Sequence, residues 1–471
     1  MKPTTTLLIF ALTLSFTGVT AHSQSAQPFS ARNQKMSLMN RTAKPSLQTA
    51  NPALSRAELL DEVQKRAFRF FWEKLDPETG LVNDRSNNSK EDDYTVASIA
   101  STGYALAALP IAVERKWVTR AEAQKRARAT LNFFLNKTEN VHGWYYHFVD
   151  RRTGKRVWNS EVSTIDTTLL LTGTLVCGQY FKADIQSAAN AIYRRMDWDW
   201  VRTNGGTKPE KLTVSHGWTP ENGFIPNEWG DYCELMQLYF LGMGASAIPA
   251  DGDGSKPVVG LPAGSWTAWK RQPYSYAGMD TLAGGPIFMH QMSHLYFNFK
   301  GQRDVLGYDY YACSLNATLI NRQFCIDHSA GRKSYSPDIW GLNAADGPDG
   351  YSAYGVPSPE DGTVSPTGAL SSLQFTPELS LRAAETMYAK YGDRLWGKYG
   401  FADSFNLDKD WYDPDVIGID LGMVLLAIEN HRSGLIWKLM ASHPAMKFAC
   451  KAAGLHPTKE GKARALQIER K

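Results

Sequence analysis

Several sequence patterns that mark common chemistries are absent from this chain of 471 residues. It has no GxSxG nucleophile elbow, no HExxH zinc motif and no GxxxxGK[ST] phosphate-binding loop. His290 and His294 have the spacing of helical metal ligands, but no glutamate accompanies them in that motif. The sequence therefore gives no support for a serine hydrolase, a zinc protease or a P-loop enzyme, and we expect neither a metal nor a cofactor.

Cysteines are few and widely scattered: Cys177, Cys233, Cys313, Cys325 and Cys450. The absence of CxxC spacing argues against a zinc ribbon, and the low density excludes a disulfide framework. We expect most of these thiols to be buried as small apolar groups, with one disulfide possible. The formal net charge is only +4, without a stripe of Lys and Arg, so we do not expect nucleic acid as a partner.

No apolar run reaches the roughly 18 residues that a membrane-spanning helix needs. A shorter run at residues 7–19 follows one early lysine, and Val19-Thr20-Ala21 fits a small-x-small cleavage site. We therefore predict a signal peptide at residues 1–21 and a periplasmic or secreted protein. Residues 22–54 are rich in Ser, Thr, Gln and Pro and are expected to form a disordered linker, and residues 456–471 a polar tail.

Helical periodicity dominates the rest of the chain, and no convincing strand competes with it apart from residues 143–149. Helices are predicted at residues 55–73, 95–115, 119–136, 163–180, 183–197, 232–244, 285–299, 304–326, 377–391, 417–432 and 434–453. Long loops rich in Trp, Tyr, Gly and Asp separate them, at residues 136–160, 198–230, 245–284 and 327–366. Long loops of this kind are usually functional.

This layout predicts an all-α protein with one large domain at residues 55–455. A ring of paired helices, the (α/α)6 barrel or toroid, with the long loops forming a cleft at one end, fits the pattern best. An irregular α bundle is the alternative. The 14 tryptophans and 21 tyrosines mainly indicate core packing, but such rings also stack on the apolar faces of sugars.

Acidic residues occur where loops run into apolar helices. Glu161 and Asp166 lie in EVSTIDTTLLLTG, and Asp166 falls near the third position of its helix. Capping the helix N-terminus would account for such an acid, with Ser163 or Thr164 as the N-cap. The apolar residues that follow favour a second interpretation, in which Asp166 faces a cavity.

Two further junctions show the same pattern. Asp231 and Glu234 precede the apolar run of residues 235–241, and Asp420 lies between Ile419 and Leu421. Asp231 is well placed as a cap, whereas Glu234 and Asp420 are embedded in apolar sequence. A buried carboxylate is costly unless it is paired or used, and burial raises its pKa toward the range of a general acid. Carboxylates without a metal or a nucleophilic serine point to the cleavage of glycosidic bonds.

The sequence from about residue 60 to 455 resembles the bacterial glucoamylase-like family. That family includes the β-1,2-glucanases of glycoside hydrolase family 144 and the glycoamylase-like region of cyclic β-1,2-glucan synthases. The stretches that carry the resemblance, in order, are FFW at 70–72, GLVNDR at 80–85, HGWYYHF at 142–148, EVSTIDT at 161–167, RRMDW at 194–198, WGDYCE at 229–234, HQMSH at 290–294, IWGLNAADGP at 339–348, DGT at 361–363, GIDLG at 418–422 and ENHRSGLIW at 429–437. Asn343 and Leu421 depart from the pattern that we expect there.

The resemblance implies an (α/α)6 barrel with its cleft at the loop end. It places Asp166, Glu234 and Asp420 in the acidic centre of that cleft, the same three residues that the local sequence indicates. Candidate substrate-binding residues are Glu161, Asp84, Arg85, His147, Trp340, Asp346 and Asp361. Ordinary structural roles are the alternative: a salt bridge for Arg85, core packing for Trp340, and turns for Asp346 and Asp361.

We therefore expect a glycoside hydrolase acting on a β-glucan, most plausibly β-1,2-linked, by an inverting mechanism with two carboxylates. Glu234 is the predicted general acid, with Asp166 or Asp420 on the side of the base. The alternatives are a glycan-binding protein on a hydrolase scaffold, a transglycosylase or exo-acting enzyme of the same family, and a polysaccharide lyase. The expected partner is an oligo- or polysaccharide, with a monomeric protein that does not span a membrane.

Overall fold

The computed structural model describes residues 54–248 and 258–458. Its α-helices are α2 (Arg56–Glu73), α3 (Ile99–Glu114), α4 (Arg120–Asn136), α5 (Thr164–Phe181), α6 (Ala183–Arg195), α7 (Trp198–Thr203), α8 (Met236–Gly244), α9 (Gly264–Ala268), α10 (Phe288–Tyr296), α11 (Tyr310–Asp327), α12 (Pro366–Leu370), α13 (Pro377–Leu395), α14 (Gly418–Arg432), α15 (Leu435–Ser442) and α16 (Pro444–Ala452). Two 3-10 helices are η1 (Ala245–Ala247) and η2 (Ser371–Gln374).

The strands are only two to four residues long, and each pairs antiparallel with a neighbour. They are β1 (Arg85–Asn87), β2 (Val96–Ser98), β3 (Asn140–Val141), β4 (Trp144–Tyr145), β5 (Phe148–Asp150), β6 (Val162–Ser163), β7 (Gly217–Thr219), β8 (Gly223–Phe224), β9 (Pro273–Tyr276), β10 (Met279–Leu282), β11 (Gln302–Arg303), β12 (Ala344–Ala345), β13 (Ser352–Ala353), β14 (Trp396–Gly397), β15 (Gly400–Phe401), β16 (Phe405–Asn406), β17 (Trp411–Tyr412), β18 (Asp415–Ile417) and β19 (His456–Pro457). They structure the long loops between the helices and leave the protein in the all-α class, as predicted.

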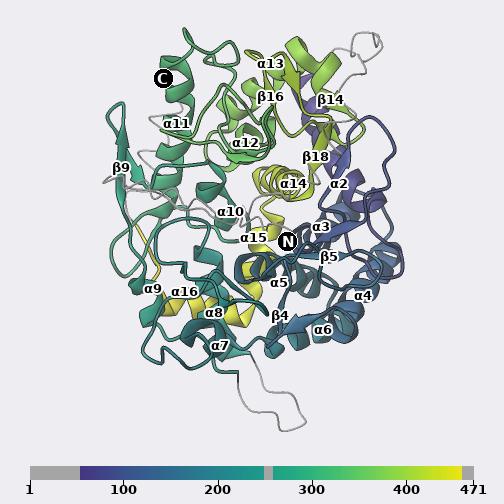
Figure 1. Ribbon diagram of the computed structural model, residues 1–471, viewed down its shortest axis with the longest axis vertical. Helices are drawn as coiled ribbons and strands as arrows, with labels where there is room; N and C mark the ends of the chain where they lie inside the picture. Colours follow the sequence, from purple (N-terminus) through teal and green to yellow (C-terminus); the bar gives the residue numbers. More distant parts are fainter. Residues whose placement is uncertain (1–53, 249–257, 459–471) are drawn as a thin grey trace, which may run out of the picture.

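The helices form an inner and an outer set. Contacts run from α3 to α5, from α5 to α8, from α8 to α10, from α10 to η2 and from α12 to α14, and α14 lies against α3. Outside them pack α2, α4, α6, α11, α13 and α16, and Figure 1 shows α14 near the middle of the view with α4, α6, α11 and α13 at the periphery. Two concentric sets of helices are the arrangement that the (α/α)6 prediction requires.

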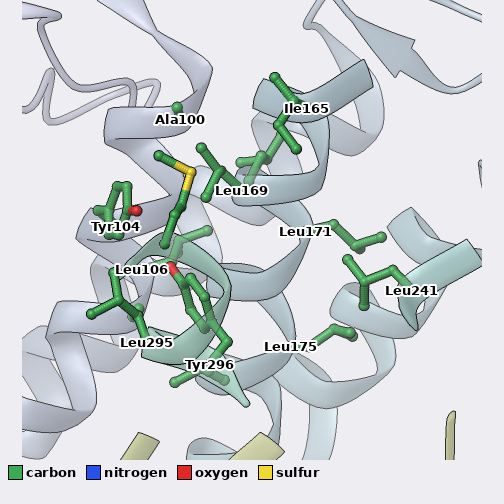
Figure 2. Packing of buried hydrophobic residues seen from close by; sticks show 14 of the residues in the cluster. Ala100, Tyr104, Leu106, Ile165, Leu169, Leu171, Leu175, Leu241, Leu295 and Tyr296 are labelled. Carbon is green, nitrogen blue, oxygen red and sulfur yellow. The ribbon is translucent and has the colours of Figure 1, made fainter. Parts of the chain in front are cut away.

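Burial follows this division. The inner helices α3, α5, α8 and α14 are buried on nearly all sides, as expected for helices enclosed by others, whereas α2, α6 and α16 bury one face. Figure 2 shows Leu106, Leu169 and Tyr296 among the side chains packed between the inner helices. At the tightest crossing a Cβ on Gly173 would lie 1.8 Å from the carbonyl oxygen of Gly103, so α3 and α5 require glycine there.

Local sequence signals set several helix ends as predicted. Ser55 and Thr119 form capping boxes with Glu58 and Glu122, and Ser163 is the N-cap of α5. The single helix predicted at residues 434–453 is instead two helices, because the chain turns at His443 before a proline, which cannot continue the preceding helix. β4 and most of β5 lie in the strand segment expected at residues 143–149, whereas the other strands were missed because segments this short show no alternating pattern.

The predictions for the two ends of the chain, the cysteines and membrane spans can be compared with the structure only where it describes the residues. The predicted signal peptide and nearly all of the predicted linker fall at residues 1–53, which the structure does not describe. Within the predicted tail, His456 and Pro457 pair with Arg303 and Gln302. All five cysteines are free thiols, so the possible disulfide is not formed. Among the described helices, none is both long and apolar enough to cross a membrane.

Candidate active site

A cavity of about 730 Å³ opens where the N-terminal ends of the inner helices meet the long loops. Its apolar wall includes Ile165 and Leu169 of α5, Phe288 and Met292 of α10, and Met423 of α14. The polar lining comprises Asp84, Arg85, Ser98, His147, Asn159, Ser160, Glu161, Asp166, Thr219, Glu221, Asn222, Glu234, Asn343 and Asp420. All three predicted catalytic acids therefore line one cavity.

Asp166 lies in the first turn of α5 and is buried. Its backbone N–H donates to the N-cap Ser163, whose hydroxyl in turn donates to Asp166 Oδ2 over 2.6 Å. The other oxygen, Oδ1, lies 3.5 Å from Nε2 of His147. Burial raises the pKa of Asp166 above its ordinary value, and His147 and Ser163 offset only part of this rise. Asp166 is thus both part of the helix cap and a cavity carboxylate.

Glu234 lies just before Leu235, the N-cap of α8, and is almost fully buried. Within the described part of the chain, no group hydrogen-bonds its Oε2 atom. Burial raises the pKa of Glu234 from its ordinary 4.5 to about 7, and the nearby Asp166 adds to this rise. A carboxyl group in this state keeps its proton at near-neutral pH, which a general acid requires.

Asp420 occupies the first turn of α14 and is also buried. Its Oδ1 accepts a hydrogen bond of 3.1 Å from the side-chain amide of Asn343, whose own oxygen is held by the backbone N–H of Phe288. Burial raises the pKa of Asp420 to about 8, with further contributions from the negative charges of Asp346 and Asp84. Like Glu234, Asp420 is a carboxyl group whose protonated form is favoured.

His147 lies between two carboxylates. Its Nδ1 is 3.0 Å from Glu161 Oε1, and its Nε2 faces Asp166. Burial opposes the charged ring, but Asp166 and Glu161 together raise the pKa of His147 to about 9. His147 in turn lowers the pKa of Glu161, against the effect of burial. The three side chains therefore carry one positive and up to two negative charges at neutral pH.

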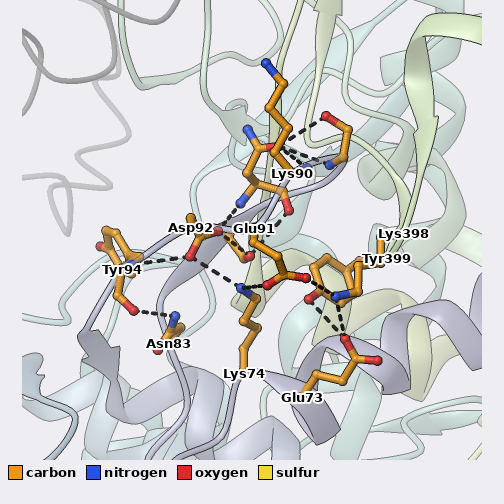
Figure 3. A network of polar contacts seen from close by, with 12 residues as sticks. Glu73, Lys74, Asn83, Lys90, Glu91, Asp92, Tyr94, Lys398 and Tyr399 are labelled. Atoms are coloured by element: carbon orange, nitrogen blue, oxygen red, sulfur yellow. Dashed lines mark hydrogen bonds and ion pairs between the residues drawn. The ribbon is translucent and has the colours of Figure 1, made fainter.

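Asp84 and Arg85 also line the cavity, and the charge of Asp84 acts on His147, Asp166 and Asp420. Arg85 donates to Asp84 over 3.1 Å and to Asp346 over 2.6 Å. The following loop is anchored through Asp92, which accepts from Ser86 and from the backbone of Asn87. Figure 3 shows the wider network, in which Lys74 pairs with Asp92 and Glu91, and Lys398 joins Glu91 to Glu73. This network fixes the loop that presents Asp84 and Arg85.

Three predicted binding residues lie away from the cavity surface. Trp340 is fully buried in a second apolar cluster, so core packing accounts for it and a stacking role does not. Asp361 accepts a hydrogen bond from the backbone N–H of Thr363 and stabilises a turn. Asp346 does not line the cavity and acts through Arg85, as its ion-pair partner. Whether such side chains reach the cavity depends on tertiary packing that the local sequence does not specify.

Other cavity residues were not singled out from the sequence. Trp158 lines the cavity and is 41% exposed, an unusual state for so large an apolar side chain. Arg156 holds the loop that carries it, donating to the carbonyl oxygens of Asn159 and Ser160 and to Glu221 of the facing β7–β8 hairpin. The aromatic loop composition was a signal for Trp158, but nothing distinguished it from the buried Trp340.

The arrangement can provide acid–base chemistry. It combines a protonated carboxyl, Glu234, with a carboxyl group beside a cation, Asp166, in one partly apolar cavity. Ligand atoms of His147, Glu161 and Asp166 also lie within 4.8 Å of one another, close enough to surround a cation. Imidazole and carboxylate groups are ligands for several divalent metals. The ion pairs among these three side chains give an account of their positions without a metal.

Comparison with known proteins gives consistent matches. The family model "Putative glucoamylase" matches residues 226–444. A curated relative, an exo-β-1,2-glucooligosaccharide sophorohydrolase of Parabacteroides distasonis that acts at the non-reducing end, is 29% identical over 426 residues. The match covers 82% of this chain and 56% of that protein, so the chain spans about half the length of this relative.

Solved structures match over most of the chain. A Bacteroides uniformis protein of the same description as the family model is 32% identical, with a TM-score of 0.78, covering 86% of this chain and 99% of the other. An endo-β-1,2-glucanase of Chitinophaga pinensis, solved with sophorotriose and glucose, is 28% identical with a TM-score of 0.75 and the same coverage of both chains.

Proposed function

Since the chain belongs to the bacterial glucoamylase-like family, we propose that it is a glycoside hydrolase that cleaves β-1,2-glucan or its oligosaccharides. Two of the similar proteins named above act on β-1,2-linked glucose, one in the exo and one in the endo mode. The observation that carries the proposal is the state of the buried Glu234, which lines the same cavity as Asp166. Its pKa is raised to about 7, and its Oε2 atom is without a hydrogen bond in the described part of the chain. A mere glycan-binding site gains nothing from keeping such a costly group.

The proposed mechanism inverts the anomeric centre. Glu234 gives its proton to the glycosidic oxygen as the bond from that oxygen to the anomeric carbon breaks. A water molecule attacks the same carbon from the opposite face, and Asp166 accepts the proton that the water loses. Exchange with solvent then restores the proton on Glu234 and the charge on Asp166. Asp420, which favours its protonated form, is proposed to bind a sugar hydroxyl near the reacting centre.

The cavity wall suggests how a glucose unit is held. We propose that Trp158 stacks on the apolar face of a pyranose ring, because this large apolar side chain lines the cavity and stays exposed. Arg85 and Asp84, fixed by their mutual ion pair, present hydrogen-bonding groups to the same cavity. We further propose that the protein is a monomer, and that it acts in the periplasm or outside the cell, as the signal peptide predicted at residues 1–21 suggests.

A substrate panel tests the proposal. The protein is incubated with linear β-1,2-, β-1,3- and α-1,4-glucans, and the products are separated by chromatography. We expect products from the β-1,2-glucan, with Glu234→Gln and Asp166→Asn each lowering kcat by roughly 10²–10⁴-fold. Proton NMR of the first products reports the anomer and so tests inversion. Binding of the glucan without any product would refute the hydrolase and favour the glycan-binding alternative.

A further inference from the structure

The backbone and the ring of His147 are both held in place by neighbouring groups. It lies between β4 and β5, and its backbone N–H donates to the carbonyl oxygen of Glu161 over 2.9 Å. Its ring stacks on Phe148, with centroids 3.9 Å apart and planes inclined by 13°. The ring plane is therefore fixed, and with it the directions in which the two ring nitrogens point.

Both nitrogens point at carboxylates. Nδ1 lies 3.0 Å from Glu161 Oε1, and Nε2 lies 3.5 Å from Asp166 Oδ1. A neutral imidazole has one N–H, so one of these two contacts would set a nitrogen lone pair against a carboxylate oxygen. The imidazolium ion has two N–H groups and satisfies both contacts. The geometry thus favours a ring that is positively charged.

Other charged groups around this pair do not reverse that conclusion. His147 is also influenced by the negative charge of Asp84, and Glu161 by the positive charge of Arg156. Asp166 is influenced by Glu161 and Asp84 in addition to His147, and it interacts with Glu234. Among the groups named as acting on Asp166, His147 is the one that supplies positive charge.

We propose that His147, oriented by Glu161, is a positioning residue that favours the ionised form of Asp166 and orients its carboxylate as the base of the reaction. This inference rests on the proposed function and goes beyond it, because it gives a physical reason why Asp166 rather than Asp420 is the base and gives Glu161 a role through His147. Asp420 has an amide, Asn343, where Asp166 has a cation. The cation lowers the pKa of Asp166 relative to what burial alone would impose, so Asp166 releases its proton at lower pH.

The test compares the pH dependence of kcat/KM for wild type, His147→Asn and Glu161→Gln on linear β-1,2-glucan. Loss of the imidazolium raises the pKa of Asp166, so the acidic limb for His147→Asn should move up by roughly 1–3 pH units. The alkaline limb, set by Glu234, should keep its position. The pH range over which kcat/KM is high should therefore become narrower. Glu161→Gln should shift the acidic limb by less than His147→Asn does, because removing Glu161 also removes a negative charge that raises the pKa of Asp166. KM should change much less than kcat.

His142→Asn is the matched control. His142 also pairs with a carboxylate, Asp197, at 3.1 Å, but the pair is exposed and lies outside the cavity. Its positive φ of 52° is one that asparagine tolerates. This variant should reproduce the wild-type profile, and circular dichroism melts of all variants check that they fold.

The outcomes separate the inference from the function. A wild-type protein that releases no product from any β-1,2-glucan refutes the proposed function itself. An active wild type, with a folded His147→Asn variant whose acidic limb is unmoved, overturns the role of His147. Loss of wild-type activity on dialysis against EDTA, with recovery on adding Zn²⁺ alone, would also overturn it, because the three side chains would then be metal ligands.

Discussion

Replacing Glu234 with glutamine should stabilise the folded protein at alkaline pH while removing most of its activity. In the wild type, Glu234 is buried and its pKa is raised from 4.5 to about 7. The folded protein therefore holds a proton between these two pH values that the unfolded chain has released. Stability falls as pH rises through this window, because the folded state binds more protons than the unfolded state.

The size of the effect follows from the two pKa values. One pH unit corresponds to about 1.4 kcal/mol, so ionising Glu234 in the folded protein costs on the order of 3 kcal/mol more than in the unfolded chain. Most of this cost arises between pH 5 and pH 8. Glutamine carries no charge, and any penalty for burying its amide is independent of pH. The stability difference between variant and wild type should therefore grow by about 2–3 kcal/mol from pH 5 to pH 8.

Thermal melts at several pH values measure this difference. For a domain of this size, the expected change corresponds to a relative gain in Tm of about 2–4 °C for Glu234→Gln at pH 8 compared with pH 5. Glu228→Gln is the control from the same loop, since Thr213 and Lys211 lower the pKa of Glu228 and its variant should show no such trend above pH 5. Parallel Tm curves for wild type and Glu234→Gln would refute the view that Glu234 is buried with a raised pKa.

Three further substitutions probe the cavity and its surroundings. Trp158→Ala should raise KM for linear β-1,2-glucan about tenfold with little change in kcat, since a stacking face is worth about 1–1.5 kcal/mol, and steady-state kinetics measure both constants. Asn343→Leu removes the donor to Asp420 and should lower kcat about tenfold in the same assay, whereas unchanged kcat would mean that this hydrogen bond is unimportant. Trp340→Phe should lower Tm, measured by calorimetry, through lost packing and leave KM unaltered, and a large rise in KM would restore Trp340 to the binding site.

Much of the fold could be predicted because its signals are local. Capping boxes at Ser55 and Thr119 mark the starts of α2 and α4 in the sequence. The apolar runs of α5, α8 and α14 indicate helices enclosed on all sides. The three candidate catalytic acids were predicted from the same local signals, because burying a carboxyl group in an apolar run is costly unless the group is paired or used. Asp166, Glu234 and Asp420 all line the cavity, as that reasoning requires.

The positions of single loop side chains could not be predicted in this way. Trp158 and Trp340 both lie in aromatic loops, yet one is exposed in the cavity and the other is fully buried. Which of the two a loop presents depends on contacts between distant segments, such as the bond from Arg156 to Glu221 that ties the Trp158 loop to the facing hairpin. Likewise, local sequence does not specify that the hydroxyls of Thr167 and Thr168, which follow Asp166, donate to the backbone carbonyl oxygens of Tyr145 and Thr164.

The three cavity carboxyls are distinguished by their neighbours rather than by their own positions. Asp166, Glu234 and Asp420 are all buried at or just before the start of an inner helix, so burial and the helix N-terminus act on each in a similar way. What differs is the contact each one makes: a cation for Asp166, an unsatisfied oxygen for Glu234 and an amide for Asp420. Environments that push carboxyl pKa values apart assign acid and base roles within one site. On this basis we propose Glu234 as the acid and Asp166 as the base, and exchanging the roles would require His147 to contact a different carboxylate.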